Sequence, residues 1–551
     1  MNFSYFSRKE IISHLKKEEL DVLVIGGGIT GAGIGLDAAS RGMKTGLVEM
    51  QDFSSGTSSR STKLVHGGLR YLKQLEVKMV GEVGKERAIV YENGPHVTKP
   101  EWMILPIYKG GTFGSFSTSL GLRVYDFLAG VKKKERRKML SIDEAIQLVP
   151  LIKREGLMGA GYYVEYRTDD ARLTIEVMKA AFEHGALPIN YTKVQSLKYK
   201  NGKIIGVFVT DELSGESYEI HAKYVVNAAG PWVDFIRDFD LSKTEKFLKL
   251  SKGAHIVIDQ SLFPLKQAVY FDTPDGRMIF AIPRGKKTYV GTTDTFFNED
   301  PLSPTASIND CTYLINAIRY IFPTITISEK QVDSSWAGVR PLIFEEGKKP
   351  SEISRKDEIW ESKSGLLTIA GGKLTGYRKM AETVVDLLAD KFKEHRNLIF
   401  APCSTRSLPI SGGDVGGAAN FRQFIDHQAI NGHHLGLSKD DANELAVMYG
   451  SNVTVLFEMI PEAIILAKNF DIAIPLALKL LYSINYEMII SPLDFFYRRT
   501  GELLFDIASV KKNKDVVLHV MSNIFQWDDN VKKHHSNELE KAMKTAVYPF
   551  R

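Results

Sequence analysis

One stretch near the start of the chain restricts its fold more than any other. It reads DVLVIGGGITGAGIGLDAASRGMKTGLVEM and covers residues 21–50. The pattern predicts a short buried strand at 21–25, a helix at 29–41 and a second strand at 44–49. Together these elements form one β-α-β unit, in which two parallel strands share a sheet and the helix packs on its face.

The glycines of this unit have the spacing of a dinucleotide-binding turn. Gly26, Gly28 and Gly31 fit the pattern G-x-G-x-x-G. The missing side chains permit a tight turn, a close approach of backbone N–H groups to a pyrophosphate, and close packing of the helix on the strand. The N-terminus of the helix adds unpaired N–H donors and the positive end of its dipole. Glu49, which ends the second strand, can accept hydrogen bonds from ribose hydroxyls, so we predict a dinucleotide site.

The choice between FAD and NAD depends on the rest of the chain, because both contain ADP. Separate FAD and NAD domains would require two full glycine fingerprints, and one is found. The segment DFSSGTSSRSTKLVHGGLRYL follows the unit directly and offers hydroxyls and backbone donors for a ribityl chain and a pyrophosphate. The later turn GGKLT can place N–H groups near a flavin ring. These features favour FAD.

Two later segments repeat the pattern of a strand followed by a turn of small residues. They are residues 218–232 and 365–392. Three such pieces far apart in sequence predict one discontinuous α/β domain with a β-rich domain inserted into it, in which residues 277–295 form a hairpin. The predicted boundaries are about 15–100, 150–235 and 335–402 for the FAD-binding domain, about 100–150 and 236–335 for the substrate domain, and 403–551 for a helical C-terminal domain.

The bulk composition limits the class of protein. A chain of 551 residues is long enough for two or three domains, and its net charge of +5 is too small to indicate a nucleic-acid binder. The two cysteines, Cys311 and Cys403, are too few for a disulfide framework or a cysteine-rich metal site, so we expect a reducing cytosol and no metal. The N-terminus is charged and no run of about eighteen apolar residues occurs, which argues against a signal peptide and a membrane-spanning helix.

Eight motifs occur in an order that one known family shares. They are IGGGITGAGIGLDAASRG, TSSRSTKLVHGGLRYL, DDARLT, VVNAAGPWV, GAHIVI, GTTDT, AGVRPL and GGKLTGYRKMAE, spread over residues 21–382. Together they resemble the FAD-dependent glycerol-3-phosphate dehydrogenases. The resemblance implies an α/β fold: a glutathione-reductase-like FAD-binding domain with an inserted antiparallel β-sheet substrate domain, followed by a mostly α-helical C-terminal domain.

The same resemblance implies a reaction. sn-Glycerol 3-phosphate loses a hydride from its central carbon to FAD and a proton from the neighbouring hydroxyl, and dihydroxyacetone phosphate forms. The electrons pass to a membrane quinone, which implies a cytoplasmic protein attached peripherally to the inner face of the cell membrane; a homodimer is left open. Two alternatives share the fold: an α-glycerophosphate oxidase, which reduces oxygen to hydrogen peroxide, and an amine or amino-acid oxidase.

The motifs also imply which residues contact the cofactor. Their backbone N–H groups and hydroxyls suit the phosphates, the ribityl chain and the flavin ring. The resemblance assigns to FAD Gly26, Gly28, Gly31, Glu49, Thr57, Ser58, Ser61, His66, Gly67, Gly68, Ala229, Gly230, Gly372, Lys373, Leu374 and Thr375.

A phosphorylated substrate requires fixed cations, and three lie in the motifs. By resemblance, Arg70 and Lys373 contact its phosphate or hydroxyl groups, and Arg340 stabilises the forming ketone oxygen. Tyr71 and Tyr270 can donate their hydroxyls to the substrate, although for Tyr270 packing alone is nearly as good an explanation.

The substrate proton requires a base with a pKa near neutrality, for which histidine is the first choice. His255, in an alternating strand of the expected substrate domain, ranks first by resemblance. His66, beside the expected flavin loop, is the second candidate for this catalytic role, or else contacts the flavin. Asp169 and Asp170 precede a predicted helix, and we expect the second acid to cap it.

One segment combines an apolar stretch with a run of cations. Residues 113–140 change from FGSFSTSLGLRVYDFLAG to a basic run, which contains Lys132, Lys133, Lys134, Arg136, Arg137 and Lys138. Such a segment can bury its apolar part in a membrane interface while its cations meet anionic headgroups. A packed helix followed by a solvated charged loop fits almost equally well.

Overall fold

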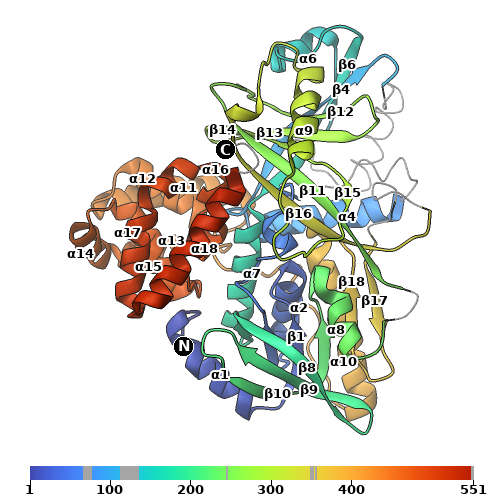
Figure 1. Cartoon of the computed structure of the whole chain (residues 1–551), viewed down its shortest axis with the longest axis vertical. Coiled ribbons are helices and arrows are strands. Elements are labelled where there is room, and N and C mark those ends of the chain that lie inside the picture. Colours follow the sequence, from blue (N-terminus) through green and yellow to red (C-terminus); the bar gives the residue numbers. More distant parts are fainter. Residues whose placement is uncertain (66–76, 112–135, 244–245, 348–352, 354–355, 548–551) are drawn as a thin grey trace.

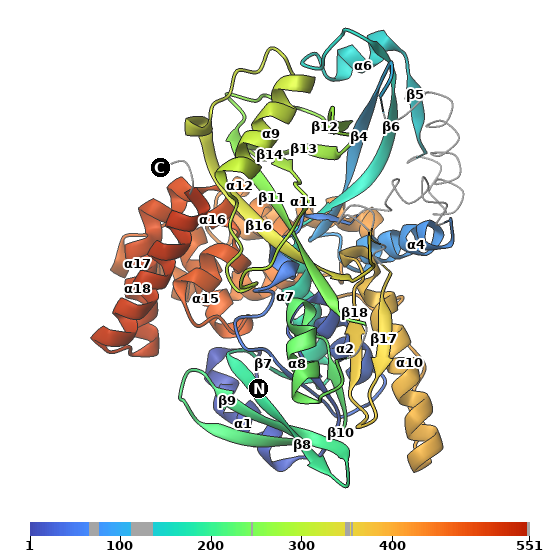
Figure 2. The ribbon, with the colours of Figure 1, turned by 45° about the vertical axis from the view of Figure 1, so that its right-hand side comes forward.

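The computed structural model describes residues 1–65, 77–111, 136–243, 246–347, 353 and 356–547. Figure 1 shows three parts: an α/β half at the bottom, a β-rich half at the top and a block of helices at the side. The long strands β11 (Leu248–Asp259) and β16 (Val332–Ile343) run between the two halves, as the turned view of Figure 2 also shows. This arrangement brings the ends of two different sheets together.

Within the described residues, the first sheet has eight strands and a parallel centre. Its middle strand, β1 (Leu20–Ile25), pairs with β10 (Ser217–Asn227) on one side and β2 (Thr45–Val48) on the other. Every residue of β1 is buried, as expected for a central parallel strand. The strand order is β17 (Glu358–Glu361), β18 (Leu367–Ala370), β10, β1, β2 and β7 (Leu187–Ile189), while β8 (Thr192–Lys200) and β9 (Lys203–Asp211) extend the sheet from β10.

Helix α2 (Ile29–Ser40) is the central helix of this half. It packs against α7 (Asp170–Glu183) and α10 (Tyr377–Arg396). Its small residues permit this close approach, since a Cβ on Gly33 would lie 2.9 Å from the ring of Tyr377. Two further helices lie at the edges of the sheet: α1 (Arg8–Lys17) contacts β7 and β10, and α8 (Val233–Phe239) contacts β18.

The second sheet is mostly antiparallel, and ten of its strands fall in the part of the chain that the structure describes. Helix α9 (Ile308–Ile321) packs on β11, and α6 (Ile142–Leu148) packs beside β6, so that both share an apolar core with the strands. Helix α4 (Val77–Asn93) precedes β4. The strand order is β15 (Thr295–Phe296), β11, β14 (Lys287–Gly291), β13 (Met278–Arg284), β12 (Ala268–Asp272), β4 (Thr98–Tyr108), β6 (Leu157–Thr168) and β3 (Leu64–Val65), with β16 paired to β11 and β5 (Lys138–Leu140) paired to β6.

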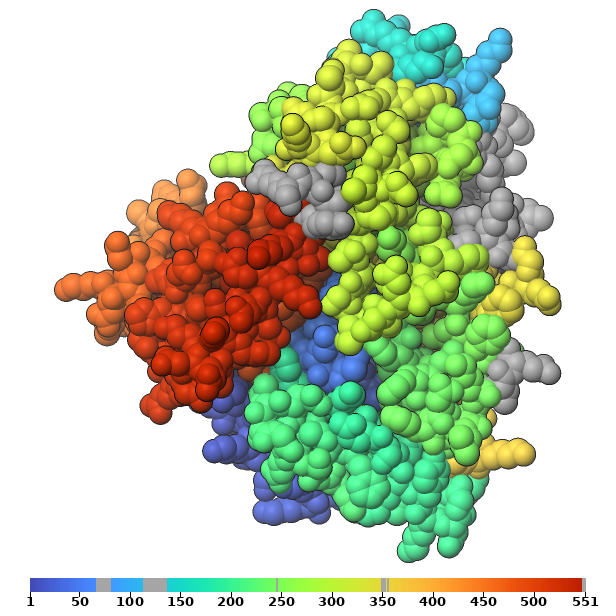
Figure 3. All heavy atoms as spheres, in the orientation of Figure 1, coloured from blue at the N-terminus to red at the C-terminus, as the bar shows by residue number. Residues whose placement is uncertain are grey.

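The C-terminal part is helical, as the sequence predicted. Figure 3 shows it as a block packed along one side of the molecule. Between α15 and α16 the chain forms a π-helical segment, η9 (Asp494–Arg499). None of the described helices combines the length and the apolar composition needed to cross a bilayer. The helices are α11 (Phe421–His434), α12 (Lys439–Tyr449), α13 (Val453–Glu458), α14 (Ile460–Phe470), α15 (Ile474–Tyr486), α16 (Glu502–Phe505), α17 (Ile507–Phe525) and α18 (Asp529–Val547).

The β-α-β unit and the β13–β14 hairpin lie where the sequence predicted them. The division into domains stays a prediction. Among the described residues, three strands in the segments expected to form the FAD-binding domain, β3, β6 and β16, pair within the ten-stranded sheet instead. Local sequence pattern predicts that a strand forms, but the choice of its partner depends on distant segments of the chain.

We expect Gly31→Ala to destabilise the cofactor turn. A Cβ at this position would lie 1.9 Å from the carbonyl oxygen of Gly26, so the helix and the turn must separate. Such overpacking costs about 1–3 kcal/mol and moves the backbone of the turn. Thermal unfolding and the flavin content of the purified protein measure both effects.

Gly35→Ala is the matched control, one turn further along α2. Its Cβ would meet its nearest neighbour at 3.7 Å, an ordinary contact. Replacing a helical glycine by alanine should then stabilise the protein by about 0.5–1 kcal/mol without loss of flavin. If Gly31→Ala and Gly35→Ala had the same stability and the same flavin content, the close contact between Gly31 and Gly26 could not be the cause.

Candidate active site

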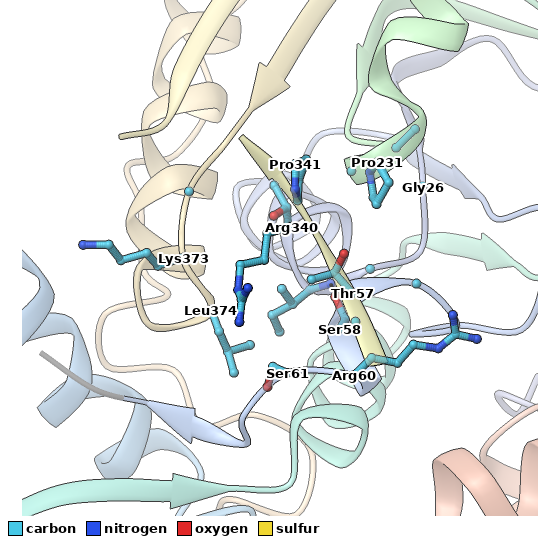
Figure 4. Close-up of a pocket in the computed structure, with 18 of the residues that line it drawn as sticks. Gly26, Thr57, Ser58, Arg60, Ser61, Pro231, Arg340, Pro341, Lys373 and Leu374 are labelled. Atoms are coloured by element: carbon cyan, nitrogen blue, oxygen red, sulfur yellow. Dashed lines mark hydrogen bonds between the residues drawn. The ribbon is translucent and has the colours of Figure 1, made fainter. Parts of the chain in front are cut away.

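A cavity of about 510 Å³ lies where the two sheets meet, and residues of both sheets line it. From the first sheet come the glycine turn after β1, the end of β2 and the turn after β10. From the second come β11, β13 and β16, and the turn at residues 371–375 closes another side. Figure 4 shows part of this lining.

The glycine turn forms one end of the cavity. Gly26 has a φ of +114°, and a Cβ there would lie 2.5 Å from the carbonyl oxygen of Ala228. Gly28 is the N-cap residue of α2, and the Ser58 hydroxyl accepts a hydrogen bond from the Ile29 N–H at 2.9 Å. The N-terminus of α2 therefore borders the cavity with backbone groups that can meet an anion.

Glu49 is held by the backbone around it. Its carboxylate accepts from the N–H of Gly27 at 2.7 Å and from that of Gln51 at 2.8 Å. Burial raises the pKa of Glu49, whereas these two donors lower it. Because the side chain also lines the cavity, its position at the end of β2 suits a ribose.

The loop at residues 57–63 is held by hydrogen bonds to distant parts of the chain. Thr57 donates its hydroxyl to the Val339 carbonyl oxygen at 2.6 Å. The N–H and the hydroxyl of Ser61 donate to Asp170 at 2.9 and 2.7 Å, and Lys63 Nζ donates to the same carboxylate at 2.5 Å. The sequence expectation that Asp170 caps α7 was wrong: Asp169 is the N-cap residue, and the buried Asp170 anchors the loop.

His255 lies on β11 in a buried slot. Its ring stacks on Trp336 at a centroid distance of 4.6 Å and an angle of 7°, and Nε2 lies 2.9 Å from the Thr62 hydroxyl. Nδ1 is buried and has no hydrogen-bond partner among the described residues. Burial holds the pKa of His255 well below its ordinary value, and the charges of Arg340 and Lys63 lower it further. The ring is therefore neutral around pH 7.

Two glycines provide the space for the two side chains expected to be catalytic. A Cβ on Gly291 would lie 2.1 Å from Cδ2 of His255, and a Cβ on Gly253 would lie 2.3 Å from Nη2 of Arg340. The guanidinium of Arg340 donates to the Thr292 hydroxyl at 3.0 Å. Asp294 lies within ion-pair distance of it, at 3.4 Å.

Two of the predicted cations, Arg340 and Lys373, are described and both line the cavity, but their side chains point in different directions. Figure 4 shows Arg340 directed between the loop with Thr57 and the turn with Leu374, whereas Lys373 extends away from it. Tyr270 lines the cavity and stacks on Phe280 at 4.1 Å. Five predicted site residues lie outside the described residues, namely His66, Gly67, Gly68, Arg70 and Tyr71.

The remaining cofactor residues expected from the sequence also line the cavity: Thr57, Ser58, Ser61, Ala229, Gly230, Gly372, Leu374 and Thr375. Gly31 does not line it, but supports the turn from behind. Three further residues of this region were not predicted from the sequence: Arg60, Thr62 and Trp336. The first two stand inside the TSSRST motif and could have been found there. The group His534, His535 and Glu538 on α18 places ligand atoms within 4.8 Å of one another, as a metal site would, but lines no part of the cavity.

FAD fits the lining residues. The glycine turn and Glu49 suit its ADP part, and the hydroxyls of residues 57–61 lie beside them. In the turn of residues 371–375, Gly371 and Gly372 have φ values of +77° and +85°, which favour glycine, and a Cβ on Gly371 would lie 2.4 Å from the carbonyl oxygen of Lys356. Backbone N–H groups of such a turn can stabilise negative charge on a flavin ring.

The chain is similar to known proteins over its whole length. Residues 21–378 match the sequence model described as FAD dependent oxidoreductase, and residues 403–532 match the C-terminal domain of alpha-glycerophosphate oxidase. The aerobic glycerol-3-phosphate dehydrogenase of Bacillus subtilis is 59% identical over 100% of this chain and 99% of its own length. The protein of the same name from Staphylococcus haemolyticus is 57% identical over 99% of this chain and 98% of its own length.

Solved structures share the fold. The glycerol-3-phosphate dehydrogenase from Bacillus halodurans complexed with FAD has a TM-score of 0.87 and 47% identity, over 100% of this chain and 99% of that one. L-alpha-glycerophosphate oxidase from Mycoplasma pneumoniae with FAD bound has a TM-score of 0.56 and 16% identity, over 70% of this chain and 97% of that one, and shows a shared fold alone. The expected fold class is confirmed.

We expect Gly291→Ala to destabilise the protein, because the new Cβ would collide with the imidazole of His255. Overpacking of this kind costs about 1–3 kcal/mol, measured by thermal or denaturant unfolding. In a His255→Ala background the ring is absent, so the same substitution should cost less. A cost that is equal in both backgrounds would show that the two residues do not share the slot.

Proposed function

Because the chain belongs to the FAD dependent oxidoreductase family, we propose that it oxidises sn-glycerol 3-phosphate to dihydroxyacetone phosphate with FAD as the hydride acceptor. The observation that carries this proposal is the full-length match, at 59% identity, to an aerobic glycerol-3-phosphate dehydrogenase. The cavity between the two sheets supports it, since it can hold a dinucleotide at one end and a small substrate at the other.

In this proposal the first sheet binds the cofactor and the second sheet carries the catalytic side chains. The glycine turn, Glu49 and the hydroxyls of residues 57–61 hold the cofactor from the first sheet, and the 371–375 turn supports its ring. When bound, FAD supplies the acceptor for the substrate hydride. His255 and Arg340, on the paired strands β11 and β16, approach the same region from the second sheet.

Arg340 is assigned to the substrate oxygen. Thr292 and Asp294 hold its guanidinium, so that it can stabilise negative charge on the oxygen that becomes the ketone. Arg70, Tyr71 and Tyr270 are assigned to the phosphate and hydroxyl groups. Lys373 extends away from Arg340, and we therefore assign it to the cofactor turn rather than to the substrate phosphate.

His255 is assigned as the base. We propose that Nε2 is the nitrogen that accepts the substrate proton, because its hydrogen-bond partner, the Thr62 hydroxyl, also lines the cavity. The stacked Trp336 fixes the plane of the ring. A neutral imidazole can accept a proton, and burial keeps His255 in that form. His66 stays the second candidate for this role.

The electron acceptor and the location belong to the same proposal. We assign a membrane quinone as acceptor and a peripheral attachment to the membrane, with the homodimer still open. Most of segment 113–140 lies outside the described residues, but Arg136 and Lys138 at its end are exposed. Exposed cations beside an apolar stretch suit an anionic membrane surface.

Anaerobic mixing with sn-glycerol 3-phosphate should bleach the absorbance of the bound flavin. A quinone analogue added next should restore the colour quickly, and oxygen should do so slowly. Fast reoxidation by oxygen with formation of hydrogen peroxide would favour the oxidase instead. Bleaching by an amino acid or by sarcosine, and not by glycerol 3-phosphate, would contradict the proposal.

His255→Ala should lower the rate of flavin reduction by about 10²–10⁴-fold, the usual contribution of a general base, with FAD still bound. Stopped-flow absorbance measures this rate. His221→Ala is the control, since His221 is half-exposed on β10 and outside the cavity. An unchanged rate in His255→Ala would exclude His255 from the mechanism. Because the pKa of His255 in the substrate-free protein lies well below its ordinary value, the rate of wild-type flavin reduction at low, subsaturating substrate should not show the loss between about pH 7 and 6 that protonation of an ordinary histidine would cause.

A further inference from the structure

Asp52 is a fully buried acid that the proposed chemistry does not use. It lies in the loop of residues 49–55, which begins with Glu49 directly after β2. Arg498 Nε donates to Oδ2 of Asp52 at 2.6 Å, and Arg499 reaches both carboxylate oxygens, at 2.8 and 3.0 Å. Burial would raise the pKa of Asp52, but the two arginines hold it below its ordinary value, so the carboxylate is charged.

The same loop contacts Gly27 in the glycine turn that follows β1. Glu49 accepts from the Gly27 N–H at 2.7 Å, and the Ser54 N–H donates to the Gly27 carbonyl oxygen at 3.0 Å. Phe53 packs so closely that a Cβ on Gly27 would lie 2.7 Å from its ring. A shift of the loop must therefore move Gly27, which stands between the two glycines at the edge of the cavity.

The two arginines come from the C-terminal part of the chain. They end the π-helical segment η9, whose wider turn directs two consecutive arginines at one carboxylate. Asp494 of the same segment accepts from Arg498 and, at 2.8 Å, from the Tyr191 hydroxyl. Arg499 also donates to the Glu487 carbonyl oxygen at 2.7 Å, so its orientation is fixed.

A second connection passes through Asn190. Its Nδ2 donates to Asp52 at 3.1 Å and to the Met488 carbonyl oxygen at 3.0 Å. Arg8 of α1 in turn donates to Asn190 at 2.6 Å. Asn190, between β7 and β8, thus connects Asp52 both to the N-terminal helix and to the C-terminal part.

We infer that the C-terminal helical part holds the flavin-binding loop in place, and that Arg499 is a positioning residue for FAD that acts through Asp52. The inference rests on FAD binding at the cavity, as proposed above, but not on the identity of the substrate. Arg499 does not line the cavity. Its guanidinium fixes the carboxylate, the carboxylate fixes the loop, and the loop fixes Gly27 and Glu49.

The test compares the FAD affinity of full-length variants. Arg499→Met leaves Asp52 with fewer donors, so the loop should relax and the dissociation constant for FAD should rise about tenfold or more. Flavin fluorescence after dilution of the holoenzyme reports FAD release. Arg499→Lys keeps the charge but loses the two-pronged contact, so its FAD affinity should lie between those of Arg499→Met and wild type. It also provides the test if Arg499→Met does not fold.

Two controls separate positioning from general stability. Val517→Ala removes a buried methyl pair from the C-terminal core, so it should lower the melting temperature and leave FAD release unchanged. Arg422→Met changes an exposed arginine of α11 and should alter neither the melting temperature nor the release of FAD. In Arg499→Met the rise in melting temperature caused by saturating FAD should shrink, because a weaker ligand stabilises less.

The inference is overturned if both Arg499 variants release FAD at the wild-type rate, whatever their melting temperatures. It is also overturned if Val517→Ala releases FAD as fast as Arg499→Met. If glycerol 3-phosphate fails to reduce the flavin while Arg499→Met still releases FAD faster, the proposed substrate is wrong and the positioning role stands.

Discussion

The structure depends on one close contact, between the first and third glycines of the cofactor turn. Helix α2 begins so near to Gly26 that a Cβ on Gly31 would overlap the Gly26 carbonyl oxygen, at 1.9 Å. A Cβ on Gly26 would in turn meet the carbonyl oxygen of Ala228, at the end of the neighbouring strand. The helix terminus and two strand ends are thereby held together with no side chain between them, and the cavity opens at that point.

Buried carboxylates then hold the loops around this contact. Asp170 binds the backbone and hydroxyl of Ser61 and the ammonium of Lys63, and Asp52 binds Arg498 and Arg499. A buried charge is tolerated only where donors surround it, so each loop has one position in which its acid is satisfied. The acids therefore specify where the loops lie before any cofactor is bound, which lowers the ordering cost of binding.

Local pattern was sufficient for the β-α-β unit, because its strand, glycine turn and helix are adjacent in sequence. It was also sufficient to select His255 and Arg340, both of which line the cavity. It was not sufficient for their partners. His255 and Thr62 are 193 positions apart, and Asp52 and Arg498 are 446 apart, so neither pair leaves a local signal. Asp169 and Asp170 show the same limit, since either acid can cap a helix and only the distant Ser61 and Lys63 decide between them.

The electrostatics of the substrate end follow from burial and from the two cations near His255. His255 is neutral because it is buried and because Arg340 and Lys63 oppose its protonation. Lys63 is paired with Asp170, and Arg340 lies near Asp294. These acids weaken the effect of the two cations on the pKa of His255 but do not abolish it. A phosphorylated substrate would bring negative charge to this region and raise the proton affinity of the imidazole. On the proposed assignment, the base thus becomes stronger when the anionic substrate whose proton it accepts is bound, and it stays neutral in its absence.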